Sequence, residues 1–138
     1  MDILPRDQRS ALMSRIKGKD TRPELLVRSL VHTLGYRFRL HRRDLPGTPD
    51  MVFPRFKKVV FVHGCFWHRH SGCRLAYTPK SNALFWATKF SRNVSRDKTA
   101  LKQLQQLGWG TLVVWECELS DTRRLTRRLT KHLSGSQP

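Results

Sequence analysis

The feature that most constrains this 138-residue chain is an eleven-residue segment, residues 63–73, that combines metal-binding and aromatic side chains. It holds three histidines, two cysteines and the adjacent pair Phe66 and Trp67. Imidazole and thiolate are the usual ligands of structural zinc, and imidazole also carries protons near neutral pH. The segment begins where residues 57–62 end, an apolar run with a basic start, and such a run is typical of a strand buried in a central sheet. We therefore expect a sheet that presents this segment at one of its ends.

The charge of the chain is strongly positive. It has 27 lysines and arginines against 10 acidic residues, a formal net charge of +17. The basic residues run through the whole chain and do not form a single tail, and such self-repulsion is tolerated most easily when the partner is a polyanion. The alternative is a generally basic, solvated surface. The composition favours a nucleic-acid partner, held through phosphate contacts whose strength depends on salt.

The length favours a single domain with a modest core. No apolar run approaches the roughly 20 residues of a membrane-spanning helix, and the N-terminus lacks the apolar core of a signal peptide. We therefore expect a cytoplasmic protein with no membrane partner. Three cysteines in such a compartment argue against a disulfide framework and leave all three available for a metal.

Hydrophobic periodicity predicts a mixed α/β domain. In chain order, the expected elements are a helix capped by Asp20 or Thr21 and ending at Gly35, strands over residues 36–40, 51–53 and 57–62, a long helix with apolar residues from Leu84 to Leu104 that ends at Gly108, a buried strand over residues 109–115, and a last helix from Asp121 or Thr122. We expect a basic N-terminal arm over residues 1–20, one folded domain over residues 21–133 and a disordered tail over residues 134–138.

The cysteines predict a metal site. Cys117 directly follows the strand expected over residues 109–115, and it reaches the same sheet end as Cys65 if that strand lies beside residues 57–62. Three thiolates and one imidazole would suit a closed, tetrahedral, structural zinc site. The expected ligands are Cys65, His70, Cys73 and Cys117.

Two alternatives to this ligand set stay open from the residues alone. His68 could reach the same ion as His70, because loop geometry does not distinguish the two histidines. Without a metal, Cys117 would be a small buried hydrophobic side chain and the other two cysteines would be unpaired.

A second group of candidates lies at the ends of neighbouring strands. Asp50 begins a strand after a loop with two prolines and a glycine, and His63 ends the next strand. A carboxylate is the usual ligand of Mg²⁺, and phosphodiester hydrolysis needs a metal, an activated water and help for the leaving oxygen. An aspartate after a turn is more often a solvated cap. The net charge and the adjacent metal-binding loop nevertheless favour a catalytic site.

Three segments carry a family resemblance: residues 45–50 (LPGTPD), 61–68 (FVHGCFWH) and 113–117 (VVWEC). They resemble the very short patch repair (Vsr) DNA mismatch endonucleases, and the similarity extends from about Arg9 to Leu119. The resemblance implies a restriction-endonuclease-like fold, with a central mixed sheet flanked by helices. It also implies a Mg²⁺-dependent nick on the 5′ side of the thymine in a T:G mismatch, the lesion left when 5-methylcytosine deaminates.

The resemblance also implies roles for single residues. Asp50 matches the magnesium ligand of the family, and the main-chain carbonyl of Val62 matches the second protein ligand. His68 matches the proposed general base for the attacking water. His63 matches a second catalytic histidine, and Glu24 matches an acidic helper near it. The four zinc ligands named above also match the family.

Further residues match DNA contacts of the family. Phe66 and Trp67 match aromatics that intercalate beside the mismatch, although most such pairs in proteins are core residues. Met13 looks like a residue that the N-terminal arm inserts into the other groove. Trp86 and Asn93, on the long helix that also carries Asp97, are expected to face the DNA.

One departure concerns the nuclease signature of this fold, an acidic residue and a lysine on the second strand. Here that strand reads Val59 to Val62 and then His63, so the resemblance implies that histidine chemistry replaces the lysine. Two other readings remain: a nuclease of the same fold with another specificity, and a zinc-containing nucleic-acid-binding module without catalysis. The leading prediction is a monomer in a bacterial cytoplasm, associated with the nucleoid. Its substrate is double-stranded DNA containing a T:G mismatch, and other repair proteins are expected as further partners.

Overall fold

The computed structural model describes residues 21–134, so the expected arm with Met13 and residues 135–138 lie outside the described residues. Its elements, in chain order, are α2 (Arg22–Thr33), β1 (Arg39–Leu40), β2 (Met51–Phe53), β3 (Lys58–His63), α3 (Ala83–Gln106), β4 (Gly110–Trp115), the short 3-10 helix η1 (Glu116–Ser120) and α4 (Thr122–Ser134). In the described part of the chain, no helix is long and apolar enough to cross a membrane.

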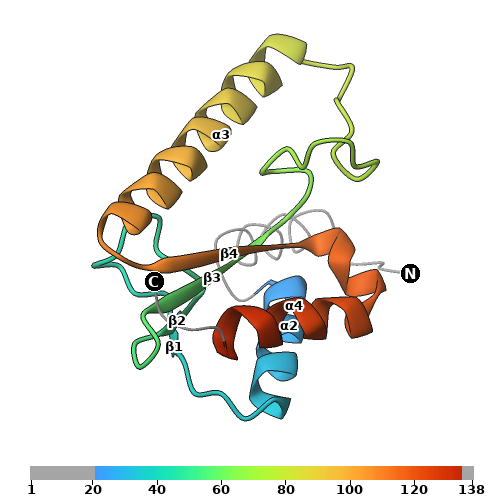
Figure 1. Cartoon of the computed structure of the whole chain (residues 1–138). Coiled ribbons are helices and arrows are strands. Elements are labelled where there is room, and N and C mark those ends of the chain that lie inside the picture. The colour runs from blue at the N-terminus through green and yellow to red at the C-terminus, as the bar shows by residue number, and fades with distance from the viewer. Residues whose placement is uncertain (1–20, 135–138) are drawn as a thin grey trace, which may run out of the picture.

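The four strands form one mixed sheet in the order β1-β2-β3-β4. The first three strands pair antiparallel, whereas β3 and β4 pair parallel. A parallel pair needs a long crossover connection, which α3 provides here (Figure 1). The prediction of a mixed α/β domain with a central mixed sheet is therefore confirmed.

Helices cover both faces of the sheet. Successive side chains on a strand point to opposite faces, so a single strand contributes to the core on each face. Met51 and Phe53 of β2 pack in a core with α2 and α4, whose leucines at 125, 129 and 133 are fully buried. Val52, between them, packs on the other face in a core that contains Leu104 of α3. In Figure 1, α3 accordingly lies on one side of the sheet and α2 and α4 on the other.

Local signals in the sequence determine where α2 begins and ends. Thr21 is the N-cap, and its hydroxyl oxygen accepts a hydrogen bond from the Glu24 amide at 3.3 Å. Pro23 lies in the first turn, where a missing N–H costs nothing. Gly35 follows the helix with a φ of 89°, a backbone conformation that favours glycine. The cap places Glu24 in the first turn, next to the candidate site.

Three expectations about the elements are corrected. The strand expected over residues 36–40 is reduced to Arg39–Leu40. β4 is an edge strand that pairs only with β3, so Val114 is its only buried residue, where a fully buried strand was expected. Leu84, at the start of the apolar pattern of α3, is 82% exposed, because this end of the helix extends beyond the sheet (Figure 1).

Candidate active site and metal centre

The parallel pairing of β3 and β4 brings the two functional segments together. His63 pairs with Trp115, so the loop after β3 and the 3-10 helix after β4 start from the same end of the sheet. This pairing confirms the expected neighbourhood of the two strands, and it brings Cys117 to the end of the sheet where Cys65 lies.

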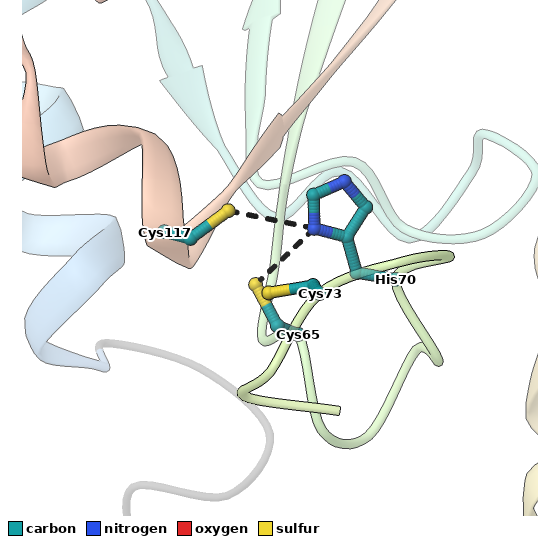
Figure 2. Close-up of side chains that lie close together, drawn as sticks. All are labelled: Cys65, His70, Cys73 and Cys117. Carbon is teal, nitrogen blue, oxygen red and sulfur yellow. Dashed lines mark hydrogen bonds between the residues drawn. The ribbon is translucent and has the colours of Figure 1, made fainter. Parts of the chain in front are cut away.

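Cys65, His70, Cys73 and Cys117 converge in space, as Figure 2 shows. Their candidate ligand atoms all lie within 4.8 Å of one another. Nδ1 of His70 is 3.6 Å from Sγ of Cys65 and 3.4 Å from Sγ of Cys117. The imidazole ring is held in this orientation by stacking on Trp115, with a centroid separation of 4.2 Å.

The donor set fits a structural zinc ion. Tetrahedral zinc with sulfur at about 2.3 Å and nitrogen at about 2.05 Å would place the two ligand atoms roughly 3.6 Å apart, which matches both distances from His70. Burial raises the pKa of the Cys65 thiol to about 12. A thiolate at this position therefore needs a nearby cation, and a zinc ion would supply one.

His68 lies apart from the cysteines. Its Nδ1 atom is 2.7 Å from Oδ2 of Asp97 on α3, and its ring stacks on His63 with centroids 3.8 Å apart and an interplanar angle of 6°. Burial, with a contribution from His68, lowers the pKa of His63 to about 4, so His63 is neutral at neutral pH. The fold thus separates the two histidines that the sequence left interchangeable, with His70 among the thiols and His68 beside His63.

Asp50 lies at the start of β2, beside the end of β3. The Val62 amide donates a hydrogen bond of 2.6 Å to Oδ2 of Asp50. Burial and the neighbouring Glu24 raise the pKa of the Asp50 carboxyl to about 8. Ionising this carboxyl group is therefore unfavourable without a nearby positive charge. A divalent cation bound at Asp50 would supply that charge.

Glu24 belongs to the Asp50 side of the site. Its side chain is buried and forms an ion pair with Arg28. Oε2 of Glu24 also lies 3.0 Å from Nε2 of His41, which is 3.9 Å from Oδ1 of Asp50. Glu24 was expected near His63, and both residues line the same cleft, but the contacts of Glu24 are with His41 and Arg28.

These groups line one cleft of about 990 Å³. Glu24, Asp50, His63 and His68 are among its lining residues, together with Asp97. Two exposed arginines, Arg43 and Arg96, also line it. Guanidinium groups match the geometry of phosphates, so the cleft combines proton-transfer groups, a candidate cation site and cationic walls.

The predicted aromatic pair lies at the same cleft. Phe66 is the centre of a cluster in which its ring contacts those of Trp67, Tyr77, Trp86 and Phe90. Tyr77 is 63% exposed and Phe85, which packs on Trp86, is 59% exposed. A cluster of aromatic side chains that remains open to solvent beside a cleft is typical of a binding surface.

Asn93 and Trp86 have intramolecular partners, although they were expected to face the DNA. Nδ2 of Asn93 donates a hydrogen bond of 3.2 Å to the main-chain oxygen of Trp67. Trp86 packs against Phe66 and Trp67. Both residues therefore support the aromatic pair from α3.

Arg69, which the sequence did not single out, holds the aromatic loop together. Its guanidinium donates hydrogen bonds to the main-chain oxygens of Phe66, Ala76 and Tyr77, at 2.9–3.2 Å. It also donates to the Thr78 hydroxyl and lies over the ring of Phe90, 4.0 Å from the centroid. In a chain with 27 basic residues, no sequence signal distinguishes this arginine.

Asp97 and His41 were also missed as site residues. Asp97 had a detectable signal, because Trp86, Asn93 and Asp97 are spaced seven and four residues apart and so share one face of a helix. His41 has no comparable signal, since it lies in the loop before β2 and reaches Glu24 only through the fold.

The comparison with solved structures identifies the fold. The chain is similar to the solved catalytic domain of the homing endonuclease I-Bth0305I, with a TM-score of 0.59 and 19% sequence identity. The match covers 82% of this chain and 94% of that one. The chain therefore has the same fold as that domain.

The sequence comparisons then define the family. Residues 1–74 match the family model of the DNA mismatch endonuclease Vsr. The chain is 52% identical to the type II nicking enzyme V.XorIIP of Xanthomonas oryzae pv. oryzae, over 98% of both chains. It is 41% identical to the DNA mismatch endonuclease Vsr of Escherichia coli K12, over 96% of this chain and 85% of that one. The protein belongs to the Vsr family of DNA mismatch endonucleases.

Proposed function

We propose that this protein nicks one strand of duplex DNA on the 5′ side of the thymine in a T:G mismatch, by Mg²⁺-dependent hydrolysis. The observation that carries the proposal is the shared cleft: Asp50, His63 and the His68–Asp97 pair line it together, beside the aromatic cluster. The names of the relatives, which include a mismatch endonuclease and nicking enzymes, support the same reaction class. The biological purpose would be repair of deaminated 5-methylcytosine.

Asp50 and the main-chain carbonyl of Val62 would hold the magnesium ion. When bound, the ion would supply positive charge that polarises the scissile phosphate and the attacking water. The hydrogen bond from the Val62 amide orients the Asp50 carboxylate. Glu24 and His41 lie behind it, and Arg28 offsets the charge of Glu24.

His68 is suited to take the proton of the attacking water. The Asp97 carboxylate accepts a hydrogen bond from Nδ1 of His68, which leaves Nε2 unprotonated and able to accept a proton. As His68 becomes an imidazolium, the same carboxylate stabilises its charge. Asp97 is therefore a positioning residue for the proposed base.

His63 acts in its neutral form in this scheme. Its low pKa keeps the ring uncharged beneath His68, so the two stacked rings do not repel each other when His68 gains a proton. A neutral imidazole can donate a hydrogen bond to the leaving 3′ oxygen without adding a charge. This role replaces the lysine that is expected on the second strand of the fold.

The aromatic pair Phe66 and Trp67 is proposed to enter the base stack at the mismatch. Stacking on an aromatic side chain contributes on the order of 1–3 kcal/mol per base, and inserting a wedge costs the unstacking of a base step. That cost is lower where pairing is already weakened, so the wedge favours a mismatch. Met13 is proposed to insert from the opposite groove, and it lies outside the described residues.

Zinc is proposed as a structural ion that joins the ends of β3 and β4. Cys65 and Cys73 come from the loop after β3, and Cys117 comes from the 3-10 helix after β4. An ion held by both segments stabilises the loop that carries the proposed catalytic histidines and the aromatic wedge. The proposal also includes a restriction-endonuclease-like fold and a cytoplasmic location. A monomer is proposed because one asymmetric lesion needs a single active site.

The decisive experiment is a nicking assay on T:G and matched duplexes across several flanking sequences, with Mg²⁺ and with EDTA. We expect one nick 5′ to the thymine, only with Mg²⁺ and only in the mismatched duplex. Asp50→Ala and His68→Ala should abolish nicking while DNA binding survives. Cleavage of matched DNA would favour a nuclease of other specificity. A protein whose activities are all unchanged by Asp50→Ala would be a binding module.

A further inference from the structure

Helix α4 has two sharply different faces. Leu125, Leu129 and Leu133 are fully buried and pack it against the sheet. On the outward side, Arg123, Arg127 and Lys131 are exposed at the same four-residue spacing. Residues four apart lie on one side of a helix, so these three cations form a line along it, which we call the α4 basic stripe.

The α4 basic stripe has no partner within the described fold. None of its three side chains forms a hydrogen bond or an ion pair with residues 21–134. Arg128 shows the contrast, because it turns toward the sheet edge, pairs with Glu118 and reaches the Val113 carbonyl. The charge of Arg128 is therefore balanced by Glu118 within the fold, whereas the three charges of the stripe have no such partner among the described residues.

The stripe also weakens the helix that carries it. Like charges four residues apart repel each other on a helix. Arg123 lies in the first turn, where the helix dipole disfavours a cation, whereas Asp121 caps that end and Lys131 lies in the last turn, where a cation is favoured. A line of like charges that repel one another and have no partner in the described fold is explained most simply by an external polyanion.

The stripe is not part of the cleft. α4 covers the face of the sheet opposite α3, as Figure 1 shows, whereas the cleft is lined by residues of α3 and α2, such as Asp97 and Glu24, and by no residue of α4. The three cations of the stripe therefore lie outside the set of groups that a ligand in the cleft would contact.

We propose that the α4 basic stripe binds the phosphate backbone of a second duplex DNA segment, separate from the one in the cleft. The helix rises about 1.5 Å per residue, so the stripe spans roughly 12 Å. One DNA strand carries three to four phosphates over about that length, which matches three cations. The inference rests on the DNA substrate of the proposed function and does not depend on T:G specificity.

The test uses the full chain without Mg²⁺ and two short duplexes, one labelled with a fluorescence donor and one with an acceptor. We expect energy transfer that saturates at two duplexes per protein monomer, with the protein-to-DNA ratio checked by sedimentation. Arg123→Gln/Arg127→Gln/Lys131→Gln should abolish the transfer and still bind one duplex. For the wild-type protein, binding of the second duplex should weaken with salt with a log–log slope of about −2 to −3, since each phosphate contact contributes about 0.9.

Two matched variants control for charge and for position. Arg123→Lys/Arg127→Lys keeps the charge of the stripe and should keep the bridging. Arg37→Gln/Arg39→Gln removes exposed arginines at the β1 side of the molecule and should also keep it. The melting temperature of the triple glutamine variant should be unchanged or higher, because repulsion along α4 is relieved.

Three results would overturn the proposal: wild-type protein that binds one duplex only, bridging that persists in the triple variant, or a triple variant that melts well below wild type. The nicking rate on a short T:G duplex is the separate readout for the cleft. If the wild-type protein bridges two duplexes but does not nick a T:G duplex, the result would count against the proposed function alone.

Discussion

Nδ1 of His68 lies 2.7 Å from Oδ2 of Asp97, and the two residues come from a loop and a helix that are 29 positions apart in sequence. This hydrogen bond separates His68 from the cysteine cluster and leaves its second ring nitrogen available in the cleft. The same loop places His70 among the thiols. One short segment thus serves two different sites.

Asp97→Asn tests the proposed orientation of His68. An amide can donate to Nδ1, which would favour the wrong tautomer and protonate the nitrogen that should act as a base. We expect single-turnover nicking with Mg²⁺ to fall by roughly 10²-fold or more, with little change in DNA affinity or melting temperature. Lys98→Gln, an exposed neighbour on α3, is the control. A nicking rate close to wild type would contradict the positioning role.

Zinc content distinguishes the two histidines. We expect purified wild-type protein to contain one zinc per chain, His70→Ala to lose it and melt at a lower temperature, and His68→Ala to keep both the zinc and the melting temperature. The physical reason is that zinc binding contributes directly to folding free energy. Metal analysis together with thermal denaturation measures both quantities. Zinc retained in His70→Ala, or lost in His68→Ala, would exclude the proposed ligand set.

The raised pKa of Asp50 predicts a pH-dependent stability. In the folded protein the pKa is about 8, well above that of an unfolded aspartate. The folded state therefore holds more protons between about pH 4 and pH 8, and this contribution to stability is lost as the pH rises through that window. Asp50→Asn lacks an ionisable group, so its stability relative to wild type should be greater at pH 8 than at pH 5.

Urea unfolding without Mg²⁺, with zinc retained, checks this expectation at both pH values. Added Mg²⁺ should stabilise wild type at pH 8, because the cation binds the ionised carboxylate, and it should not stabilise Asp50→Asn. An equal difference between the two proteins at pH 5 and pH 8 would show that Asp50 ionises normally in the fold.

Arg69→Lys tests the loop that carries the aromatic wedge. A lysine keeps the charge but cannot donate to four oxygens from a planar fork. We expect the preference for T:G over matched duplex to fall, together with a loss of about 1–3 kcal/mol in unfolding free energy. Arg74→Lys, which alters an exposed arginine of the same loop, should change neither. Unchanged discrimination in Arg69→Lys would mean that the wedge does not depend on this arginine.

Gly47→Ala tests the loop that leads into Asp50. Gly47 has a φ of 75°, and an added Cβ would lie 2.7 Å from the Cβ of Ala100 on α3. Gly35→Ala is the matched control, because its φ of 89° is similarly strained but no atom lies within 4 Å of the added Cβ. We expect Gly35→Ala to cost about 1 kcal/mol and Gly47→Ala to cost distinctly more in urea unfolding. Equal losses would show that the loop moves aside without penalty.

Several parts of the fold followed from local patterns. The caps and glycines around α2, the apolar run of β3 and the leucines of α4 predicted those elements, because each signal acts within one or two turns of the chain. The expectation that Cys117 joins Cys65 also held, since it needed only the parallel pairing of β3 with β4. The sequence motifs predicted that the chain belongs to the Vsr family, and the comparisons confirm this prediction.

Other parts depended on contacts that no local pattern encodes. β4 reads as a buried strand but forms the sheet edge, because hydropathy does not reveal how many partners a strand has. The first turns of α3 carry apolar side chains that remain exposed, since the helix extends past the sheet it packs on. The link from Glu24 to His41 joins residues 17 positions apart and arises only when α2 packs beside the loop before β2.

The histidine–cysteine segment shows the division most clearly. Its residue types by themselves determined that the chain carries metal-binding and proton-transfer chemistry beside an aromatic pair, because those properties belong to the side chains. Only the tertiary structure decided which partners each histidine has. His70 stacks on Trp115 toward the thiols, and His68 turns toward Asp97. Neighbouring histidines in one loop are chemically identical, and they differ only in the partners that the fold brings to them.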